Sequence, residues 1–339
     1  MSKLLEVKNL KTSFKTHLGD VKAVRGISFY VDKGEAIGIV GESGCGKSVS
    51  MMSIMKLLSE NANIECDEIL FDGDDISKYK EKDMEQIRGN RISMIFQDPM
   101  TSLNPLYTIG TQLTEHLIKH KGLSKKDAWT KGIEILDLVG IPSPESRMKQ
   151  YPHEFSGGMR QRAMIAISLI CEPSLIIADE PTTALDVTIQ AQILDLMKIL
   201  KEKLNTSIIL ITHDLGVVAD LCSRINVMYG GVIVETGSAE DIFYRSKHPY
   251  TWGLLNSVPN PLSEFREKLI PIEGQPPDLL KPPTGCPFAE RCKYTMKICL
   301  DKKPPLFKLG ENHNSSCWLC HENAPKVTSE IEVKQYGEK

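Results

Sequence analysis

The chain of 339 residues is 41% hydrophobic, and its 41 lysines and arginines nearly balance 44 acidic residues, giving a formal net charge of −3. This length accommodates one large domain and a smaller one, and the balanced charge argues against a nucleic-acid partner. Apolar runs such as Ile208–Ile211 are far too short to span a bilayer, and Met1–Glu6 lacks the apolar core of a signal peptide, so we expect a protein of the cytosol.

The chain is expected to begin with β-strands. Alternating apolar residues predict strands at Leu4–Phe14 and Val24–Val31, which would form a small antiparallel layer. The continuous apolar run Ala36–Val40 is typical of a strand buried on both faces. A helix-compatible run, Ser48–Leu58, follows it.

A glycine-rich stretch, Gly41–Ser48, lies between that strand and that helix and fits the phosphate-loop pattern G-x-x-x-x-G-K-S/T. The glycines let backbone N–H groups wrap a phosphate, and the helix N-terminus adds its positive end. Lys47 is expected to reach the β- and γ-phosphates, and the Ser48 hydroxyl to bind Mg²⁺. The flanking strand and helix disfavour the alternative, a chance glycine-rich turn. We expect the nucleotide to contact Gly41, Ser43, Gly44, Cys45, Gly46, Lys47, Ser48 and Val49.

The middle of the chain changes from strand to helix periodicity. Strands are predicted at Ile69–Phe71 and Arg91–Gln97. From about residue 101 to 165, apolar residues recur at helical spacing and prolines interrupt the pattern. We interpret this range as a helical insertion within an α/β core.

Two carboxylates follow a buried strand. The apolar run Leu175–Ala178 leads directly into Asp179 and Glu180. Because ligands bind at the carboxyl ends of strands in parallel α/β sheets, Asp179 is expected beside the Mg²⁺ held by Ser48, directly or through water. Glu180 is then placed to accept a proton from the attacking water or to orient it. Without the upstream phosphate loop, a solvated acidic turn would be the favoured interpretation.

Helices and strands are expected to alternate over the next part of the chain. Apolar spacing predicts helices at Met159–Ile170 and across Ile189–Leu204, followed by a buried strand at Ile208–Ile211. Gly230-Gly231 between two short apolar runs is a hairpin signal. This order of elements predicts an α/β fold.

A second candidate anion site lies at Ser156-Gly157-Gly158, just before the predicted helix. Ser156 is suited to cap that helix, and the glycines bare backbone N–H groups. On these residues alone, a plain N-cap with a flexible entry would be favoured. Followed by Arg160-Gln161-Arg162, however, the stretch resembles the signature motif of ATP-binding-cassette (ABC) ATPases. Phe155 and Met159 stand where most members have Leu and Gln, but the Ser-Gly-Gly centre is intact.

Other features of the ABC resemblance follow in the family's order. Gln97 is similar to the Q-loop glutamine, which contacts Mg²⁺ and the attacking water, and His213 is similar to the switch histidine, which steadies the γ-phosphate. Ala184-Leu185-Asp186 resembles the D-loop at the dimer seam. Phe14 is similar to the aromatic residue that stacks on adenine. Its spacing to Gly41 is somewhat long, and a core role is the alternative.

The ABC resemblance covers roughly Leu4–Trp252 and implies both a fold and a mode of action. The implied fold is a RecA-like core with an antiparallel β layer and the helical insertion, in a nucleotide-binding domain of residues 1–252. The implied action is that of a head-to-tail dimer, in which one subunit's phosphate loop and the other's Ser156-Gly157-Gly158 enclose ATP. Binding of ATP would close the dimer, and hydrolysis would release it.

Four stretches resemble more narrowly the ATP-binding subunits of oligopeptide/dipeptide importers. They are Gln97–Pro105, Tyr151–Ser156, Thr182–Gln190 and His248–Thr251. This resemblance implies a peripheral ATPase on the cytoplasmic face of the cell membrane that powers uptake of di- or oligopeptides. The implied partners are integral membrane permease subunits, contacted by the helical insertion, and a second ABC ATPase subunit, as a heterodimer or a homodimer. An extracellular peptide-binding protein would act indirectly.

The composition shifts after about Trp252, since eleven of the nineteen prolines and five of the nine cysteines lie between residues 258 and 325. We expect residues 253–325 to form a separate loop-rich extension stapled by a metal, and residues 326–339 a frayed tail. Four thiolates brought together hold an iron–sulfur cluster or zinc. Resemblance to the extension of the peptide-importer branch implies a 4Fe–4S cluster, with zinc or free thiols as alternatives. The expected ligands are Cys286, Cys292, Cys299 and Cys317, with Cys320 as another choice for the fourth.

Three other functions are weighed against peptide import. An importer ATPase for nickel or glutathione fits the same motifs, because the ATPase does not touch the solute. A soluble ABC ATPase of translation or DNA repair usually carries two cassettes or long coiled coils, and neither is visible here. A non-enzymatic nucleotide sensor is disfavoured by the intact set of Lys47, Asp179, Glu180 and His213.

Overall fold

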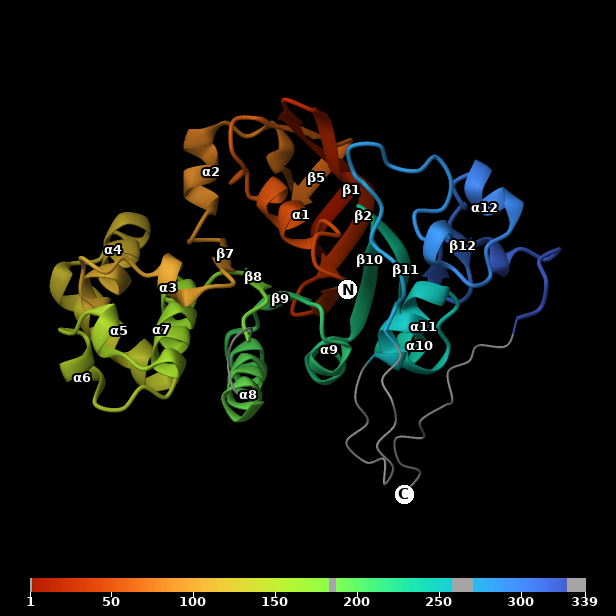
Figure 1. Cartoon of the computed structure of the whole chain (residues 1–339). Helices are drawn as coiled ribbons and strands as arrows, with labels where there is room; N and C mark the ends of the chain where they lie inside the picture. Colours follow the sequence, from red (N-terminus) through yellow and green to blue (C-terminus); the bar gives the residue numbers. More distant parts are fainter. Residues whose placement is uncertain (1, 183–186, 258–270, 328–339) are drawn as a thin grey trace, which may run out of the picture. The chain divides into compact units, whose positions relative to one another are not determined.

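The computed structural model describes residues 2–182, 187–257 and 271–327 (Figure 1). Its residue contacts divide the chain into two compact units. The first comprises Met1–Leu4, Val31–Ala36 and Phe71–Ile211, and the second comprises Leu5–Tyr30, Ile37–Leu70 and Thr212–Lys339. Among the described residues, no helix combines the length and the apolar character that crossing a membrane requires.

A parallel group of buried strands organises the first unit. β8 (Leu175–Asp179) is its middle strand and pairs in parallel with β7 (Ile92–Ile95) and with β9 (Ser207–Thr212). Every residue of β8 and β9 is buried, which explains why both read as continuous apolar runs. Because the strands are parallel, the residues that follow β7 and β8 emerge at the same edge of the sheet.

Helices of the first unit gather around α7, and Figure 1 shows α4 and α5 beside it, with α6 next to α5. Side-chain oxygens of Thr108 and Ser124 cap α4 and α5, and Gly122 ends α4 in a left-handed conformation. The helices predicted from apolar spacing are confirmed as α4, α5 and α7, and three short elements lie between or before them. The bounds are α3 (Pro99–Ser102), α4 (Ile109–Lys121), α5 (Lys125–Leu138), α6 (Pro144–Arg147), η2 (Pro152–Glu154) and α7 (Gly157–Leu169).

Four further elements belong to the first unit. The long helix predicted across Ile189–Leu204 is present as α8 (Val187–Leu204). The other three are short elements that the apolar spacing did not reveal, namely β6 (Asp74–Asp75), η1 (Ile76–Lys78) and α2 (Glu81–Ile87).

The second unit contains the predicted layer of N-terminal strands. β1 (Lys3–Thr16) lies between β2 (Gly19–Asp32) and β5 (Glu68–Phe71), and it also pairs antiparallel with β4 (Ala62–Glu65). Leu5 and Val7 of β1 are buried, as the apolar alternation predicts.

A second sheet of this unit carries the phosphate-loop strand. β3 (Ala36–Val40) pairs in parallel with β10 (Arg224–Tyr229), and β10 forms an antiparallel hairpin with β11 (Val232–Ser238). Gly230 and Gly231 have φ values of 53° and 80°, which a two-residue hairpin turn requires. The helices of the unit are α1 (Lys47–Ile54), α9 (Leu215–Leu221), α10 (Ala239–Tyr244), α11 (Pro249–Asn256), η3 (Ala289–Arg291), α12 (Lys297–Asp301) and η4 (Trp318–Cys320).

The described part of the proline-rich stretch is joined to this sheet. β13 (Asn314–Ser315) pairs antiparallel with β11 and with β12 (Phe307–Lys308). Glu235 of β11 is fully buried, and its carboxylate accepts hydrogen bonds from the Thr251 hydroxyl at 2.6 Å and from His313 Nε2 at 3.0 Å. The expectation of a separate module at residues 253–325 is therefore not confirmed.

Candidate functional site

The loop between β3 and α1 has the geometry that the phosphate-loop pattern predicts. Gly44 and Gly46 have φ values of 77° and 102°, which favour glycine. A Cβ atom on Gly46 would lie 2.5 Å from the carbonyl oxygen of Ala23, and one on Gly41 would lie 2.1 Å from that of Met228. The loop thus packs closely against neighbouring backbone, and this path is possible only because glycine has no side chain at these two positions.

Lys47 is the first residue of α1, and its side chain is buried, with the residue only 5% exposed. Nζ donates hydrogen bonds to the carbonyl oxygens of Gly41 at 2.7 Å and Glu42 at 3.0 Å. Within the described part of the chain, no carboxylate forms an ion pair with Lys47. Nζ also lies 4.0 Å from Cys45 Sγ, a weak acceptor. A buried cation with only neutral partners is poorly compensated, so this site suits an anion such as a phosphate.

Glu42 is held by two residues from late in the sequence. Its N–H donates to the Tyr250 hydroxyl at 2.8 Å, and its carboxylate accepts from Arg291 Nη1 at 2.5 Å and Nη2 at 3.0 Å. Sequence reasoning missed Tyr250 and Arg291, because the phosphate-loop pattern accepts any residue at this position and no local signal links it to residues so distant.

In the first unit, the structure brings Gln97 and Glu180 together. Asp179 ends β8 and is buried, and Glu180 follows it. The N–H of Glu180 donates to the Ile211 carbonyl at 2.9 Å, and Gln97 Nε2 donates to Glu180 Oε2, also at 2.9 Å. Two candidate residues predicted separately therefore form one hydrogen-bonded pair at the carboxyl edge of the parallel strands.

Glu180 has a strained backbone. Its φ of 46° lies in the left-handed region, which costs a side-chain-bearing residue about 1–2 kcal/mol. Such strain is kept when the surroundings impose it, and it is frequent at functional sites. In this conformation the Glu180 carboxylate accepts the hydrogen bond from Gln97.

The Ser-Gly-Gly stretch forms an exposed helix start. The Ser156 hydroxyl caps α7 by accepting from Met159 N at 3.3 Å. A Cβ atom on Gly157 would meet nothing within 4 Å, so the backbone there is accessible. Phe155, which stands where most ABC ATPases have Leu, is buried, so the position keeps an apolar side chain.

The roles of His213, Phe14 and residues 184–186 at the nucleotide stay predictions, and the structure gives only where the first two lie. His213 directly follows β9 and precedes Asp214, the N-cap of α9. Phe14 is half-buried in β1, opposite Ala62 of β4. Residues 184–186, which resemble the D-loop, lie outside the described residues.

The prediction of an iron–sulfur cluster is wrong, and so is the zinc alternative. Among the described residues, no three or more His, Cys, Asp or Glu side chains are grouped so that they could hold a metal ion. Burial raises the pKa of Cys286 to about 11 and also raises the pKa values of Cys292 and Cys317. Burial therefore favours the protonated thiol over the thiolate that binds metals. Cys286, Cys292, Cys299, Cys317 and Cys320 are free thiols.

Comparison with known proteins links both units to one family. The family described as ABC transporter matches residues 24–183, and the one described as oligopeptide/dipeptide transporter, C-terminal region, matches residues 234–299. The chain is 56% identical to the oligopeptide transport ATP-binding protein OppD of Bacillus subtilis, over 98% of this chain and 94% of that protein. It is 53% identical to the dipeptide transport ATP-binding protein DppD of Lactococcus lactis, over 96% of this chain and 93% of that protein.

Solved structures agree on the fold. A dimeric ATP-binding cassette in a post-hydrolysis state, bound to ADP and Pi, matches with a TM-score of 0.62 and 26% identity. The match covers 69% of this chain and 98% of that chain. The fold is thus that of an ABC ATPase.

Proposed function

The chain belongs to the ABC transporter family, as an ATP-binding protein of its oligopeptide/dipeptide branch, and we propose that it hydrolyses ATP to power a di- or oligopeptide importer. The observation that carries the proposal is the phosphate loop around Lys47, whose buried charge is bonded to neutral groups of the loop, the Gly41 and Glu42 carbonyl oxygens and the Cys45 sulfur. The names of relatives that match nearly the whole chain support peptides as the cargo.

ATP would be held by the phosphate loop and the start of α1, with Phe14 against the adenine. Mg²⁺ would be held by the Ser48 hydroxyl, the Asp179 carboxylate and Gln97, a set of the oxygen donors that this ion prefers. Gln97 is suited to such a role, because it uses Nε2 for its bond to Glu180. That bond leaves Oε1, the amide atom that ligates metals, for Mg²⁺. The bound ion would neutralise charge on the β- and γ-phosphates.

Glu180 would act on the water that attacks the γ-phosphorus. Its carboxylate accepts the proton of that water or orients it for in-line attack. The bond from Gln97 restricts where the carboxylate points, and orientation of this kind lowers the barrier more than a mobile carboxylate does. His213 would steady the γ-phosphate.

Closure of the site would need a second ATPase subunit. In the proposed head-to-tail dimer, Ser156-Gly157-Gly158 of each subunit faces the nucleotide of the other. The exposed N-terminus of α7 and the open space at Gly157 support this role, since bare N–H groups at a helix start bind phosphate well. The second subunit would be a similar but distinct chain or an identical copy.

The proposed membrane partners would dock on the helices around α3 and α4. Met100, Leu106 and Tyr107 are 62%, 80% and 53% exposed, and grouped exposed apolar side chains mark protein contacts. We therefore propose that this segment contacts permease subunits, which places the chain at the cytoplasmic face of the membrane. A peptide-binding protein on the outer face would deliver the cargo.

The proposal is tested by reconstituting the chain with its permease subunits, second ATPase and binding protein in lipid vesicles. We expect ATP hydrolysis that peptides stimulate, together with peptide uptake that requires ATP. Failure of the assembled complex to consume ATP would exclude the enzyme. Stimulation by nickel or glutathione, but not by peptides, would reassign the cargo while keeping the ATPase.

A further inference from the structure

Arg291 and the phosphate loop are joined by an ion pair that the nucleotide-binding motifs do not account for. Both guanidinium Nη atoms bind the Glu42 carboxylate, at 2.5 Å and 3.0 Å. This two-point geometry is the strong form of an arginine–carboxylate pair. It joins the second residue of the loop to a residue 249 positions later in the chain.

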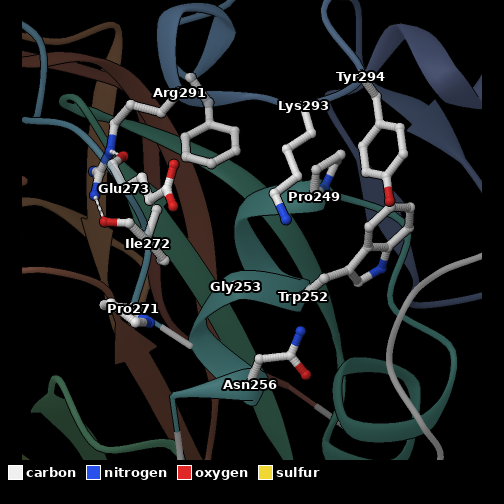
Figure 2. Close-up of a pocket in the computed structure, with 11 residues that line it drawn as sticks. Pro249, Trp252, Gly253, Asn256, Pro271, Ile272, Glu273, Arg291, Lys293 and Tyr294 are labelled. Carbon is white, nitrogen blue, oxygen red and sulfur yellow. Dashed lines mark hydrogen bonds between the residues drawn. The ribbon is translucent and has the colours of Figure 1, made fainter. Parts of the chain in front are cut away.

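Every donor of Arg291 is occupied. Besides Glu42, it donates to the Tyr229 hydroxyl at 3.1 Å and to the carbonyl oxygens of Ile272 and Glu273, both at 2.9 Å. Figure 2 shows Arg291 beside Ile272 and Glu273 at the edge of a cavity of about 120 Å³. Its side chain is only 5% exposed. Burial lowers the pKa of Arg291, but the hydrogen bonds to Glu42 and Tyr229 outweigh this and raise it.

Aromatic rings fix the second contact to the loop. The Tyr250 hydroxyl accepts from the N–H of Glu42 at 2.8 Å. The ring of Tyr250 packs 4.5 Å from that of Tyr229 and 5.3 Å from that of Phe288, and Phe288 lies 5.2 Å from Tyr229. Phe288 immediately precedes η3, which carries Arg291. Backbone and side chain of Glu42 are therefore held by one rigid cluster.

Glu42 also touches the residue that would meet the phosphates. Its carbonyl oxygen accepts from Lys47 Nζ at 3.0 Å. A continuous set of hydrogen bonds thus runs from Arg291 through Glu42 to Lys47. Any shift of Glu42 would move the backbone of the phosphate loop and also the carbonyl oxygen that accepts from Lys47.

We propose that Arg291 and Tyr250 are positioning residues for nucleotide binding, which hold Glu42 so that the loop and Lys47 are already arranged for the phosphates of ATP. This inference rests on the proposed function. Neither residue touches the nucleotide in this role, and both contribute to affinity only by preorganising the loop. The C-terminal segment is then part of the ATP site and not only an appendage to it.

The test compares Glu42→Gln, Arg291→Met and the double variant, each as the full chain in the assembled complex. Each single change should raise the KM for ATP about tenfold or more, since bonds between charged groups are lost, with kcat little changed. The double variant should raise KM by less than the product of the two single effects, because both changes remove the same ion pair. Arg291→Lys should restore only part of the affinity, since an ammonium lacks the planar fork.

Two controls separate positioning from general destabilisation. Arg245→Met removes an exposed arginine paired with Glu240 and Asp241 and should leave KM unchanged. If Arg291→Met fails to fold, Tyr250→Phe and Glu42→Gln still test the inference, because neither changes a residue of the described C-terminal stretch 271–327. Wild-type KM in these two variants, additive effects in the double variant, or a loss of kcat at constant KM would overturn the inference. Wild-type protein that binds no nucleotide would instead overturn the proposed function.

Discussion

Gln97 Nε2 donates a hydrogen bond to Glu180 Oε2 at 2.9 Å, which joins the segments that follow two parallel strands, β7 and β8. One side chain is a neutral amide and the other a carboxylate, so the bond orients Glu180 without neutralising it. In the proposed mechanism, this bond aims the carboxylate at the attacking water.

The first prediction concerns Glu180 itself. Glu180→Gln keeps the shape of the side chain but removes its basicity, so turnover should fall at least about a hundredfold, while ATP binding and closure of the dimer persist. Phosphate release and nucleotide-dependent dimerisation measure the two effects. The matched change Glu202→Gln, on the exposed face of α8, should alter neither. Unchanged turnover in Glu180→Gln would remove Glu180 from the mechanism.

The second prediction concerns the orienting bond. Gln97→Leu removes both the bond to Glu180 and a proposed Mg²⁺ ligand, so kcat should fall about tenfold or more. The loss should be smaller in an enzyme that already carries Glu180→Gln, because orienting a side chain that is no longer a base has no effect and only the loss of the Mg²⁺ ligand remains. Gln86→Leu, on the exposed face of α2, is the control. Independent, multiplicative losses would show that the observed bond has no role in turnover.

The third prediction separates backbone strain from steric conflict. Gly46 and Gly73 have similar φ values of 102° and 93°, but a Cβ atom on Gly46 would lie 2.5 Å from a carbonyl oxygen, whereas one on Gly73 would meet nothing within 4 Å. Gly73→Ala should cost about 1–2 kcal/mol of unfolding free energy, and Gly46→Ala about 2 kcal/mol more. Urea unfolding and nucleotide binding measure this, and only Gly46→Ala should weaken binding. Equal losses of unfolding free energy in the two variants would show that the loop moves to accommodate the added Cβ atom without a steric cost.

The fourth prediction concerns pH. Burial lowers the pKa of His248 to about 4, whereas histidine in an unfolded chain titrates near 6.5. Between these values the unfolded chain binds a proton that the folded one does not, so stability falls as pH drops from about 6.5 toward 4, by at most about 3 kcal/mol.

His248→Asn tests this dependence, because asparagine keeps a cap for α11 and does not titrate. The difference in Tm between pH 7.5 and pH 5 should shrink in this variant. It should stay at the wild-type value in His17→Asn, where the histidine is exposed. A wild-type difference in His248→Asn would assign the acid sensitivity to other groups.

The fifth prediction concerns the proposed permease contact. Leu106 is 80% exposed, so Leu106→Asp should change stability by less than about 0.5 kcal/mol and leave nucleotide binding intact. Recovery of permease subunits with the chain should nevertheless drop. Leu18→Asp, at a position 72% exposed, is the matched control and should recover them normally. Equal recovery with both variants would place the docking surface elsewhere.

Contiguous residues were sufficient to predict the local elements that carry the candidate nucleotide site. The phosphate loop, its strand and its helix occupy one short stretch, and Asp179 and Glu180 directly follow the apolar run that predicts β8. Such features depend on backbone preferences and apolar periodicity, which neighbouring residues set between themselves. Short elements such as β4 and β13 escaped prediction, because so few residues show no clear period.

Only the tertiary structure decided which distant side chains meet. The spacing of the cysteines allowed a metal site, yet the described fold gathers no group of residues that could hold one. Conversely, nothing near Arg291 in the sequence pointed to Glu42, although the fold joins the two by a buried ion pair. Local patterns specify elements and loops because their interactions span a few residues. Pairs far apart in the chain depend on how the whole fold packs, which no short stretch records.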